Sequence, residues 1–390
     1  MNNKNYKKNY MKKRKIFYLF VISLLLFNIV GCSGDENSSN STTEGSQVTS
    51  SEQIYSTDTE STTENATVEQ ETTTVIDVPI ITGNENLLTG LKTLSNEAVG
   101  KRPVAVMVNN IAAALPQHGV AQADIIFEIP VEGGLTRLMA MYGDYTKVPR
   151  ICSVRSCRKY FPAISEGFDA IYVNWGMPAE HANYVASLKL THYEGMNNTG
   201  GLFGRDQNRL NAGYSLEHTG YFNGTGLVAS LNKNKWRTDI EDDKKGTAFV
   251  FNAEENVVPT GNVCTEVKVN FGTMYSTFTY DEKTKTYLKQ HNGKAHVDGS
   301  TGTQLAFTNV IILETKITTA TNGVHKEVDW HGGAGAVGYY ISNGSVQKIT
   351  WSKANEESQI KLYDESGNEL AINRGKSYIA IGFKGKTTIK

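Results

Sequence analysis

Residues 103–142, PVAVMVNNIAAALPQHGVAQADIIFEIPVEGGLTRLMAMY, decide the fold of this chain. Three apolar runs lie in this stretch, at 103–109, 124–129 and 136–142, and a fourth run of the same character follows at 168–174. Each run is six or seven residues long, and such short apolar runs bounded by turn-forming residues are typical of buried strands. We therefore predict that these four runs form strands of a sheet.

Helical patterns lie between and after these runs. They predict helices at 157–166, at 178–188, where Pro178 is a favourable first helical residue, and at 220–232. Strands that alternate with helices indicate a layered α/β or α+β arrangement. The first part of the folded body is therefore predicted to be a mixed domain over residues 81–240.

The pattern changes at the polar stretch 239–246, and from residue 245 to 390 short alternating strands dominate. Turn signals such as Asn292-Gly293, Asn343-Gly344 and Ser366-Gly367 separate them. The predicted strands are 247–252, 265–271, 277–281, 286–290, 304–314, 338–342, 346–351, 359–363 and 377–383. The fold class predicted for the whole is α+β, a mixed domain followed by a mainly antiparallel, β-rich domain.

The N-terminus has the pattern of a secretory signal peptide over residues 1–31. Seven Lys or Arg residues precede the apolar run 16–30, which is short for a membrane span. The run ends in Ile29-Val30-Gly31-Cys32, which resembles a lipobox, where a lipid is attached to the cysteine and the chain is cut before it. We expect Cys32 to be lipidated; an uncleaved anchor helix is the alternative. Both place the rest of the chain on the extracytoplasmic face of the cell membrane.

The segment 32–80 after this cysteine is predicted to be a disordered, acidic, Ser/Thr-rich tether. Between residues 33 and 77 it holds ten Asp or Glu and no Lys or Arg. Such a composition buries too little apolar surface to offset the entropy of ordering. A flexible chain of this length has a root-mean-square reach of about 40 Å.

Charge and cysteine content narrow the classes of partner. The full chain has a net charge of −1, but without the signal peptide and the acidic tether the body is near +2. A body this close to neutral makes nucleic acid an unsuitable partner. Beyond Cys32 there remain Cys152, Cys157 and Cys264, an odd number that argues against a disulfide framework. Cys152 and Cys157 could pair, but we interpret them as small buried apolar residues.

Several unusual strings occur in order along the body. They are RPVAVMVNN at 102–110, CSVRSCR at 152–158, FDAIYVNWG at 168–176, FGRDQNR at 203–209, HVDGSTGTQLAFTNVIIL at 296–313 and GGAGAVGYYISNG at 332–344. With them the chain resembles the YerB-like lipoprotein family (DUF3048), and the resemblance extends over nearly all of 100–390. It implies a cell-envelope lipoprotein with a mixed N-terminal and a β-rich C-terminal domain, and it implies no known reaction.

The densest set of polar side chains lies in the mixed domain, where apolar strands end in polar residues. Such strand ends commonly deliver side chains to a binding cleft. The catalytic candidates are Glu128 and Glu132, and the binding candidates are Asn109, His118, Asp124, Arg137, Arg155, Arg158, Arg205, Asp206 and Arg209.

Three interpretations fit this set. Glu128 and Glu132 could be the acid and base of a wall-glycan hydrolase or transferase. The arginines could bind a carboxylate or phosphate, with the glutamates orienting them. The same charges could instead form a buried Glu–Arg network that stabilises the core, because buried charges must be paired.

A second polar set lies in the β-rich domain. His296, Asp298, Asp329 and His331 form two pairs at spacing i,i+2, which places both members of a pair on one side of a strand. They are weak metal candidates, and simple turn and surface residues are the more usual explanation. No phosphate-binding loop or catalytic motif is found, so the sequence indicates neither a cofactor nor an established reaction. We therefore expect a lipid-anchored binding or scaffolding protein, attached to the membrane, with an envelope protein or peptidoglycan as its partner.

Overall fold

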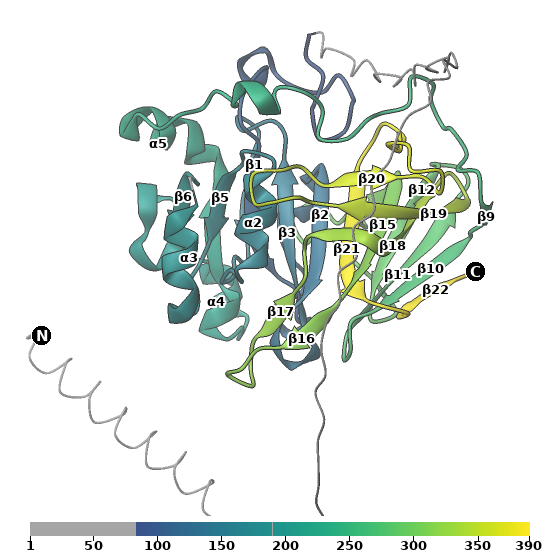
Figure 1. Cartoon of the computed structure of the whole chain (residues 1–390). Coiled ribbons are helices and arrows are strands. Elements are labelled where there is room, and N and C mark those ends of the chain that lie inside the picture. Colours follow the sequence, from purple (N-terminus) through teal and green to yellow (C-terminus); the bar gives the residue numbers. More distant parts are fainter. Residues whose placement is uncertain (1–82, 189) are drawn as a thin grey trace, which may run out of the picture. The chain divides into compact units, whose positions relative to one another are not determined.

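A computed structural model describes residues 83–188 and 190–390 (Figure 1). The predicted signal peptide, Cys32 and the predicted tether lie outside these residues. The described residues all belong to one compact unit.

A sheet of eleven strands forms the centre of this unit. Its order is β20-β19-β18-β15-β21-β2-β3-β1-β5-β6, and β9 pairs with β19. Its strands are β1 (Val104–Asn109), β2 (Ile125–Pro130), β3 (Thr136–Tyr142), β5 (Ile171–Asn174), β6 (His192–Glu194), β9 (Asn262–Val263), β15 (Asn309–Thr315), β18 (Gly332–Ser342), β19 (Ser345–Ser352), β20 (Lys361–Tyr363) and β21 (Ser377–Phe383).

The central sheet joins the two halves of the sequence. Strand β21, near the C-terminus, pairs in parallel with β2, with Ile125 opposite Ser377 and Glu128 opposite Ala380. On the other side of β21 lies β15, also parallel. Strands predicted to belong to two successive domains therefore share one hydrogen-bonded sheet.

Smaller sheets surround the central one. A six-stranded antiparallel sheet contains β10 (Glu266–Asn270), β11 (Tyr275–Asp281), β12 (Thr286–His291), β13 (Lys294–Ala295), β14 (Ala306–Phe307) and β22 (Thr387–Ile389). A three-stranded sheet contains β4 (Arg150–Cys152), β7 (Phe203–Arg205) and β8 (Gly220–Asn223), and the hairpin β16–β17 joins Ile317–Thr319 to Lys326–Val328. Antiparallel pairing dominates the C-terminal part, which confirms the predicted α+β class.

The α-helices of the described chain are short and lie in its N-terminal half. They are α2 (Tyr160–Glu166), α3 (Ala182–Ser187), α4 (Gln207–Asn211) and α5 (Leu227–Asn234). Single 3₁₀ turns connect many of the strands, among them the turn Ala179–His181 before α3.

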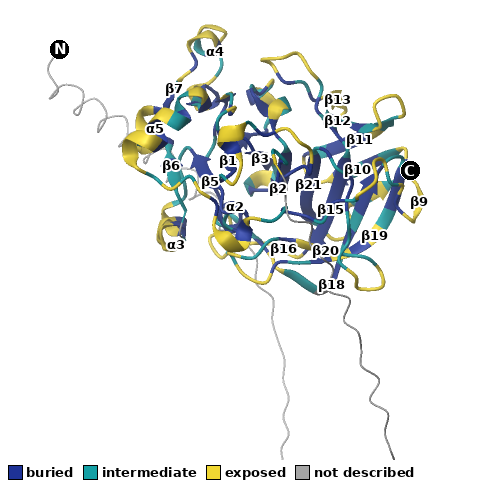
Figure 2. Cartoon of the chain, turned by 90° about the horizontal axis from the view of Figure 1, so that it is seen from above, coloured by how far each residue is buried: buried dark blue, intermediate teal, exposed yellow. Residues whose placement is uncertain are grey.

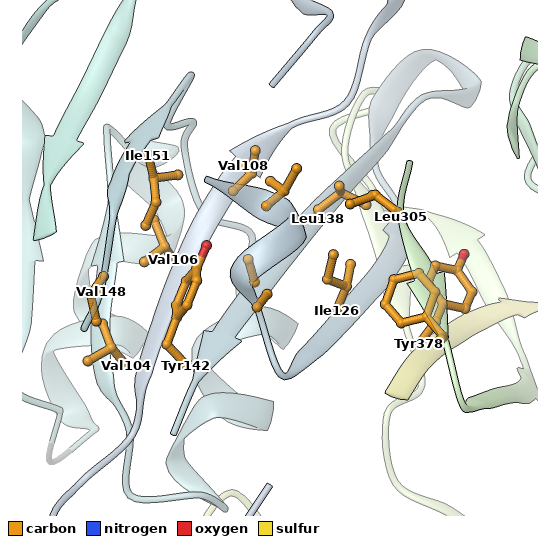
Figure 3. Packing of buried hydrophobic residues seen from close by; sticks show 14 of the residues in the cluster. Val104, Val106, Val108, Ile126, Leu138, Tyr142, Val148, Ile151, Leu305 and Tyr378 are labelled. Carbon is orange, nitrogen blue, oxygen red and sulfur yellow. The ribbon is translucent and has the colours of Figure 1, made fainter. Parts of the chain in front are cut away.

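Strand alternation divides the apolar core between the two faces of the central sheet. Val104, Val106 and Val108 of β1 lie in the cluster on one face, where the six-stranded sheet packs (Figure 3). Ala105 and Met107 point to the other face, which α2 covers. Successive side chains of a strand point to opposite faces, so a run that is apolar at every position suits a strand buried on both sides. Figure 2 shows that the central strands are buried and that the peripheral loops are exposed.

Three of the predicted elements differ from the structure. The single strand predicted at 304–314 is divided between β14 of the six-stranded sheet and β15 of the central sheet. In the predicted helix 220–232, residues Gly220–Asn223 form strand β8, and α5 begins only after Gly226. Glycine is a poor helix former, and the three glycines at 220, 224 and 226 delay the helix. The predicted strand 247–252 consists of bends and one isolated bridge from Phe251 to Ile372, because it has no continuous partner strand.

Candidate functional site

Glu128, on β2, lies at the centre of the molecule and not at an edge of it. Its side chain has 0 % exposure and forms an ion pair with Lys289 of β12 at 3.2 Å. Its two carboxylate oxygens also accept hydrogen bonds from Asn110 (3.0 Å), Thr136 (2.7 Å), Ser276 (2.8 Å) and Tyr378 (2.8 Å). These donors come from both halves of the chain.

The surroundings of Glu128 keep it ionised. Burial alone would raise the pKa of this carboxyl group, but the charge of Lys289 and the hydrogen bonds of Thr136 and Ser276 outweigh burial and lower it. A buried carboxylate whose oxygens are all engaged has no access to a glycan. Its geometry suits the structural interpretation, in which paired buried charges hold the core together.

Glu132, which follows β2, is held by two arginines. Arg158 donates to Glu132 through both Nε (2.9 Å) and Nη2, and Arg137 donates to Oε1 at 3.1 Å. Partial burial would raise the pKa of Glu132, but the hydrogen bond from Arg158 and the two guanidinium charges lower it to about 2. Burial and the neighbouring Arg158 lower the pKa of Arg137 to about 10. A carboxylate this acidic does not serve as a general acid at neutral pH.

This ion-paired group lies beside the carboxyl ends of parallel strands. Strands β1, β5 and β6 run parallel in the order β1-β5-β6 and end at Asn109, Asn174 and Glu194. The segment 152–158 connects the first two strand ends, because the Arg155 amide donates to Met107 O and the Trp175 amide donates to Arg155 O, both at 3.0 Å. Carboxyl ends of parallel strands are the usual place for ligands in α/β sheets.

Arg155, Trp175, Arg205 and Glu217 gather at this edge, and we call them the strand-end surface. Arg155 pairs with the exposed Glu217 at 2.6 Å. The guanidinium carbon of Arg205 lies 4.1 Å from the ring centroid of Trp175, and Arg205 Nη1 donates to Leu216 O at 2.7 Å. Burial and the nearby charge of Arg155 lower the pKa of Arg205.

Arg205 is exposed, and among the cations of the strand-end surface it is the one that remains available to a ligand. No carboxylate in the described part of the chain forms an ion pair with it. Trp175 holds the guanidinium of Arg205 in one plane, because the indole ring also packs against Phe203, with 5.6 Å between the ring centroids. A stacked guanidinium with free donors can bind a carboxylate or phosphate with fixed geometry.

The other predicted binding residues have structural partners. Asn109 contacts His218 Nδ1 at 3.1 Å, and Asp124 accepts from the Gly143 amide at 2.7 Å. Asp206 caps helix α4 and pairs with Arg150 at 2.9 Å. Arg209 donates to the carbonyls of Ala114, Pro116 and His218. The backbone of His118 bridges to Cys152, and burial lowers the pKa of its ring.

The second polar set does not assemble. His296 is buried against Gln117, with Nε2 2.8 Å from Oε1, and Asp298 accepts from the amides of Ala121 and Ser300 at 2.8 Å. Asp329 and His331 are exposed and contact each other at 3.4 Å. In the portion that the structure describes, these four residues do not form a metal-binding group. The buried His296 and Asp298 form hydrogen bonds with loop residues instead.

The three cysteines of the body are free and buried, as interpreted from the sequence. Burial raises the pKa of Cys152 to about 11 and that of Cys157 to about 12. Such thiols are poor nucleophiles and suit small apolar positions.

Sequence reasoning missed Lys289, the partner of Glu128. The only signal was the alternation of β12, in which Tyr287, Lys289 and His291 point inward. It also missed Trp175, which follows an apolar strand directly.

Within residues 83–188 and 190–390, no helix has both the length and the apolar character needed to span a membrane.

Comparison with known proteins finds a matching family model for each half of the chain. Residues 88–237 match "Protein of unknown function (DUF3048) N-terminal domain", and residues 267–379 match the corresponding C-terminal domain. The chain is 28% identical over 300 residues to "Putative lipoprotein YerB" of Bacillus subtilis (strain 168), covering 75% of this chain and 85% of that protein. It also resembles the crystal structure of the YerB protein from Bacillus subtilis, with a TM-score of 0.66, 27% identity, and coverage of 78% of this chain and 98% of the other.

Proposed function

Because the chain belongs to the DUF3048 family, with both of its domains, we propose that it is a lipid-anchored binding or scaffolding protein of the bacterial cell envelope. In this proposal the lipid on Cys32 holds it at the extracytoplasmic face of the cell membrane, and the strand-end surface binds an anionic group of an envelope polymer or protein. The signal peptide, the lipobox and a relative described as a lipoprotein support the anchor.

The observation that carries the binding proposal is the state of Arg205. Its guanidinium is exposed, stacked on Trp175 and without a carboxylate partner among the described side chains. Stacking on an aromatic ring orients a guanidinium without using its donors, so the donors of Arg205 that do not bind Leu216 O stay available to an anion. Arg155 lies close by, but its charge is paired with Glu217 at 2.6 Å, so Arg205 is the cation that remains for an anion.

The alternative is a wall-glycan hydrolase or transferase that uses Glu128 and Glu132. Both carboxylates are bound in ion pairs, and Glu128 has 0 % exposure. A glycosidase needs two carboxyl groups that flank one bond of the substrate, one of them protonated. The binding interpretation does not require Glu128 or Glu132 to reach a substrate.

Co-sedimentation with purified cell-wall sacculi tests the binding proposal. Mature full-length protein in detergent is mixed with sacculi that keep their anionic polymers and with sacculi from which these polymers have been removed. We expect Arg205→Gln to weaken binding about tenfold or more, because a charge-assisted hydrogen bond contributes roughly 1.5–3 kcal/mol. Lys348→Gln, which removes one exposed charge from β19, is the matched control and should bind normally.

Equal binding by the Arg205→Gln variant and the unchanged protein would refute the role of this surface. Soluble fragments in the supernatant, identified by mass spectrometry and lost in Glu132→Gln, would favour the hydrolase. The anchor is tested separately. Cys32→Ala should abolish lipid labelling and release the protein or leave it unprocessed, and unchanged labelling would contradict the proposal.

A further inference from the structure

A hollow of about 710 Å³ lies between the segment around α3 and the hairpin β16–β17, and none of its lining residues belongs to the strand-end surface. Lys159, Tyr184 and Trp330 form part of its wall. The remaining wall includes Glu180, His181 and His325, which the sequence patterns did not single out. Glu180 and His181 belong to the 3₁₀ turn Ala179–His181, and His325 lies directly before β17.

The metal-binding atoms of these three side chains converge. One ligand atom from each of Glu180, His181 and His325 lies within 4.8 Å of those of the other two. The Glu180 carboxylate is 2.6 Å from His325 Nδ1, and the two imidazole rings are 5.6 Å apart. Asn322 Nδ2 lies 3.1 Å from the Glu180 carboxylate and 2.8 Å from His325 Nδ1, while its Oδ1 accepts from two hairpin amides.

His181 gives an independent sign of a missing partner. Its side chain is 7 % exposed, and its Nδ1 atom is buried with no hydrogen-bond partner among the described residues. A buried polar atom without a partner costs about 1–3 kcal/mol, so such an atom in a protein calls for an explanation. A metal ion would give this ring a partner, because the ring borders a hollow and faces a second histidine and a carboxylate.

We propose that Glu180, His181 and His325 bind a divalent zinc ion. Two imidazoles and one carboxylate are a known three-residue ligand set for zinc, and the fourth position is then open to water or a ligand group. In a tetrahedral zinc site with ligands about 2.0–2.2 Å from the ion, neighbouring ligand atoms are roughly 3.3–3.6 Å apart, which lies inside the 4.8 Å that bounds these atoms. Glu180 and His325 are 2.6 Å apart, so they would move slightly apart to bind the ion. Asn322 would orient the Glu180 carboxylate from outside the coordination shell, as second-shell groups do.

The site joins the two family segments. Glu180 and His181 lie in the segment 88–237, and His325 lies in the segment 267–379. Zinc would therefore fix the hairpin β16–β17 to the turn before α3, with its open position toward the hollow. The neighbouring Lys159 is neutralised by Glu327, with which it forms an ion pair, so it does not oppose a cation.

The test uses mature full-length protein in detergent, without a histidine tag and stripped of metal by a chelator. Zinc binding is measured by calorimetry, and cobalt(II) is added separately because its visible absorption reports tetrahedral coordination. We expect one ion per chain. His325→Gln and Glu180→Gln should each weaken binding at least tenfold, and zinc should raise the melting temperature of the unchanged protein but not of these variants.

His331→Ala is the matched control, since it removes an exposed histidine of the same region outside the group. It should bind one ion as tightly as the unchanged protein. Absence of micromolar zinc binding in the unchanged protein would overturn the proposal, and so would undiminished binding by His325→Gln. If His331→Ala were the only variant that lost binding, the metal would lie at Asp329 and His331, and this result would also overturn the proposal. His325→Gln changes an exposed turn, and circular dichroism checks that it is folded.

Discussion

The ion pair between Glu128 and Lys289 leads to a prediction about how the two halves of the chain are held together. Both side chains have 0 % exposure, and their charged atoms lie 3.2 Å apart. Glu128 belongs to β2 and Lys289 to β12, so the pair connects the central sheet with the six-stranded sheet. The perturbation is Lys289→Met, which keeps the length of the side chain and removes its charge.

The expected magnitude follows from the geometry. At 3.2 Å and an effective dielectric constant of about 20, the attraction is about 5 kcal/mol. Removing the ammonium group also removes its desolvation cost, but it leaves a buried carboxylate unpaired, and such changes cost about 3–5 kcal/mol in total. For a folded body of this size that corresponds to a fall in melting temperature of roughly 5–8 °C.

The assay is urea unfolding followed by tryptophan fluorescence, which is sensitive to both halves because Trp175 and Trp351 lie in different segments. The double variant Glu128→Gln/Lys289→Met should lose less stability than the sum of the two single variants, by 2 kcal/mol or more, since it leaves no unpaired charge. Lys348→Met on the exposed face of β19 is the control and should change stability by no more than about 0.5 kcal/mol. A loss below about 1 kcal/mol in Lys289→Met, or simple additivity in the double variant, would refute the reasoning.

Three further predictions concern protonation and thiol chemistry. The pKa of Glu132 is lowered to about 2 from 4.5, so its contribution of about 2–3 kcal/mol is fully present above pH 4.5 and is lost as the pH falls toward 2; unfolding between pH 7 and 2 should show this loss in the unchanged protein and not in Glu132→Gln. Burial lowers the pKa of Lys353 to about 7, so above pH 7 the unfolded chain binds more protons than the folded chain, and the free energy of unfolding should rise by about 2 kcal/mol between pH 7 and 9; a rise of the same size in Lys353→Met would contradict this cause. Cys152, Cys157 and Cys264 are buried thiols with raised pKa values, so a thiol reagent should modify none of them in the folded protein and all three after unfolding; rapid modification of the folded protein would show that they are accessible.

Local patterns were sufficient to predict most of the elements of the sheet. The runs 103–109, 124–129 and 136–142 are apolar at nearly every position, and they form β1, β2 and β3, which are buried on both faces. Periodicity and apolar content are local properties, and they determine which residues become strands whatever the partners are. The same reasoning fails at 220–232, where three glycines interrupt a helical pattern.

The candidate site could be predicted only as a list of polar residues. Spacing showed that Arg155, Arg158, Glu128 and Glu132 follow or lie on apolar strands, but it could not show which of them become buried. The structure buries Glu128 completely and leaves Arg205 exposed on Trp175. The burial of Glu128 depends on its ion pair with Lys289, 161 positions farther along the chain, and no local pattern connects these two residues.

The amino-acid pattern alone predicted a signal peptide, a lipobox at Cys32, an acidic segment after it and an α+β body, and the structure confirms the α+β body. These features rest on composition and short-range periodicity, which neighbouring residues specify directly. Only the tertiary structure decided that β21 pairs with β2, so that both halves share one sheet, and that Glu180 and His181 meet His325. Such contacts join residues more than a hundred positions apart, and they form because the whole chain must bury its apolar strands and pair its buried charges at the same time.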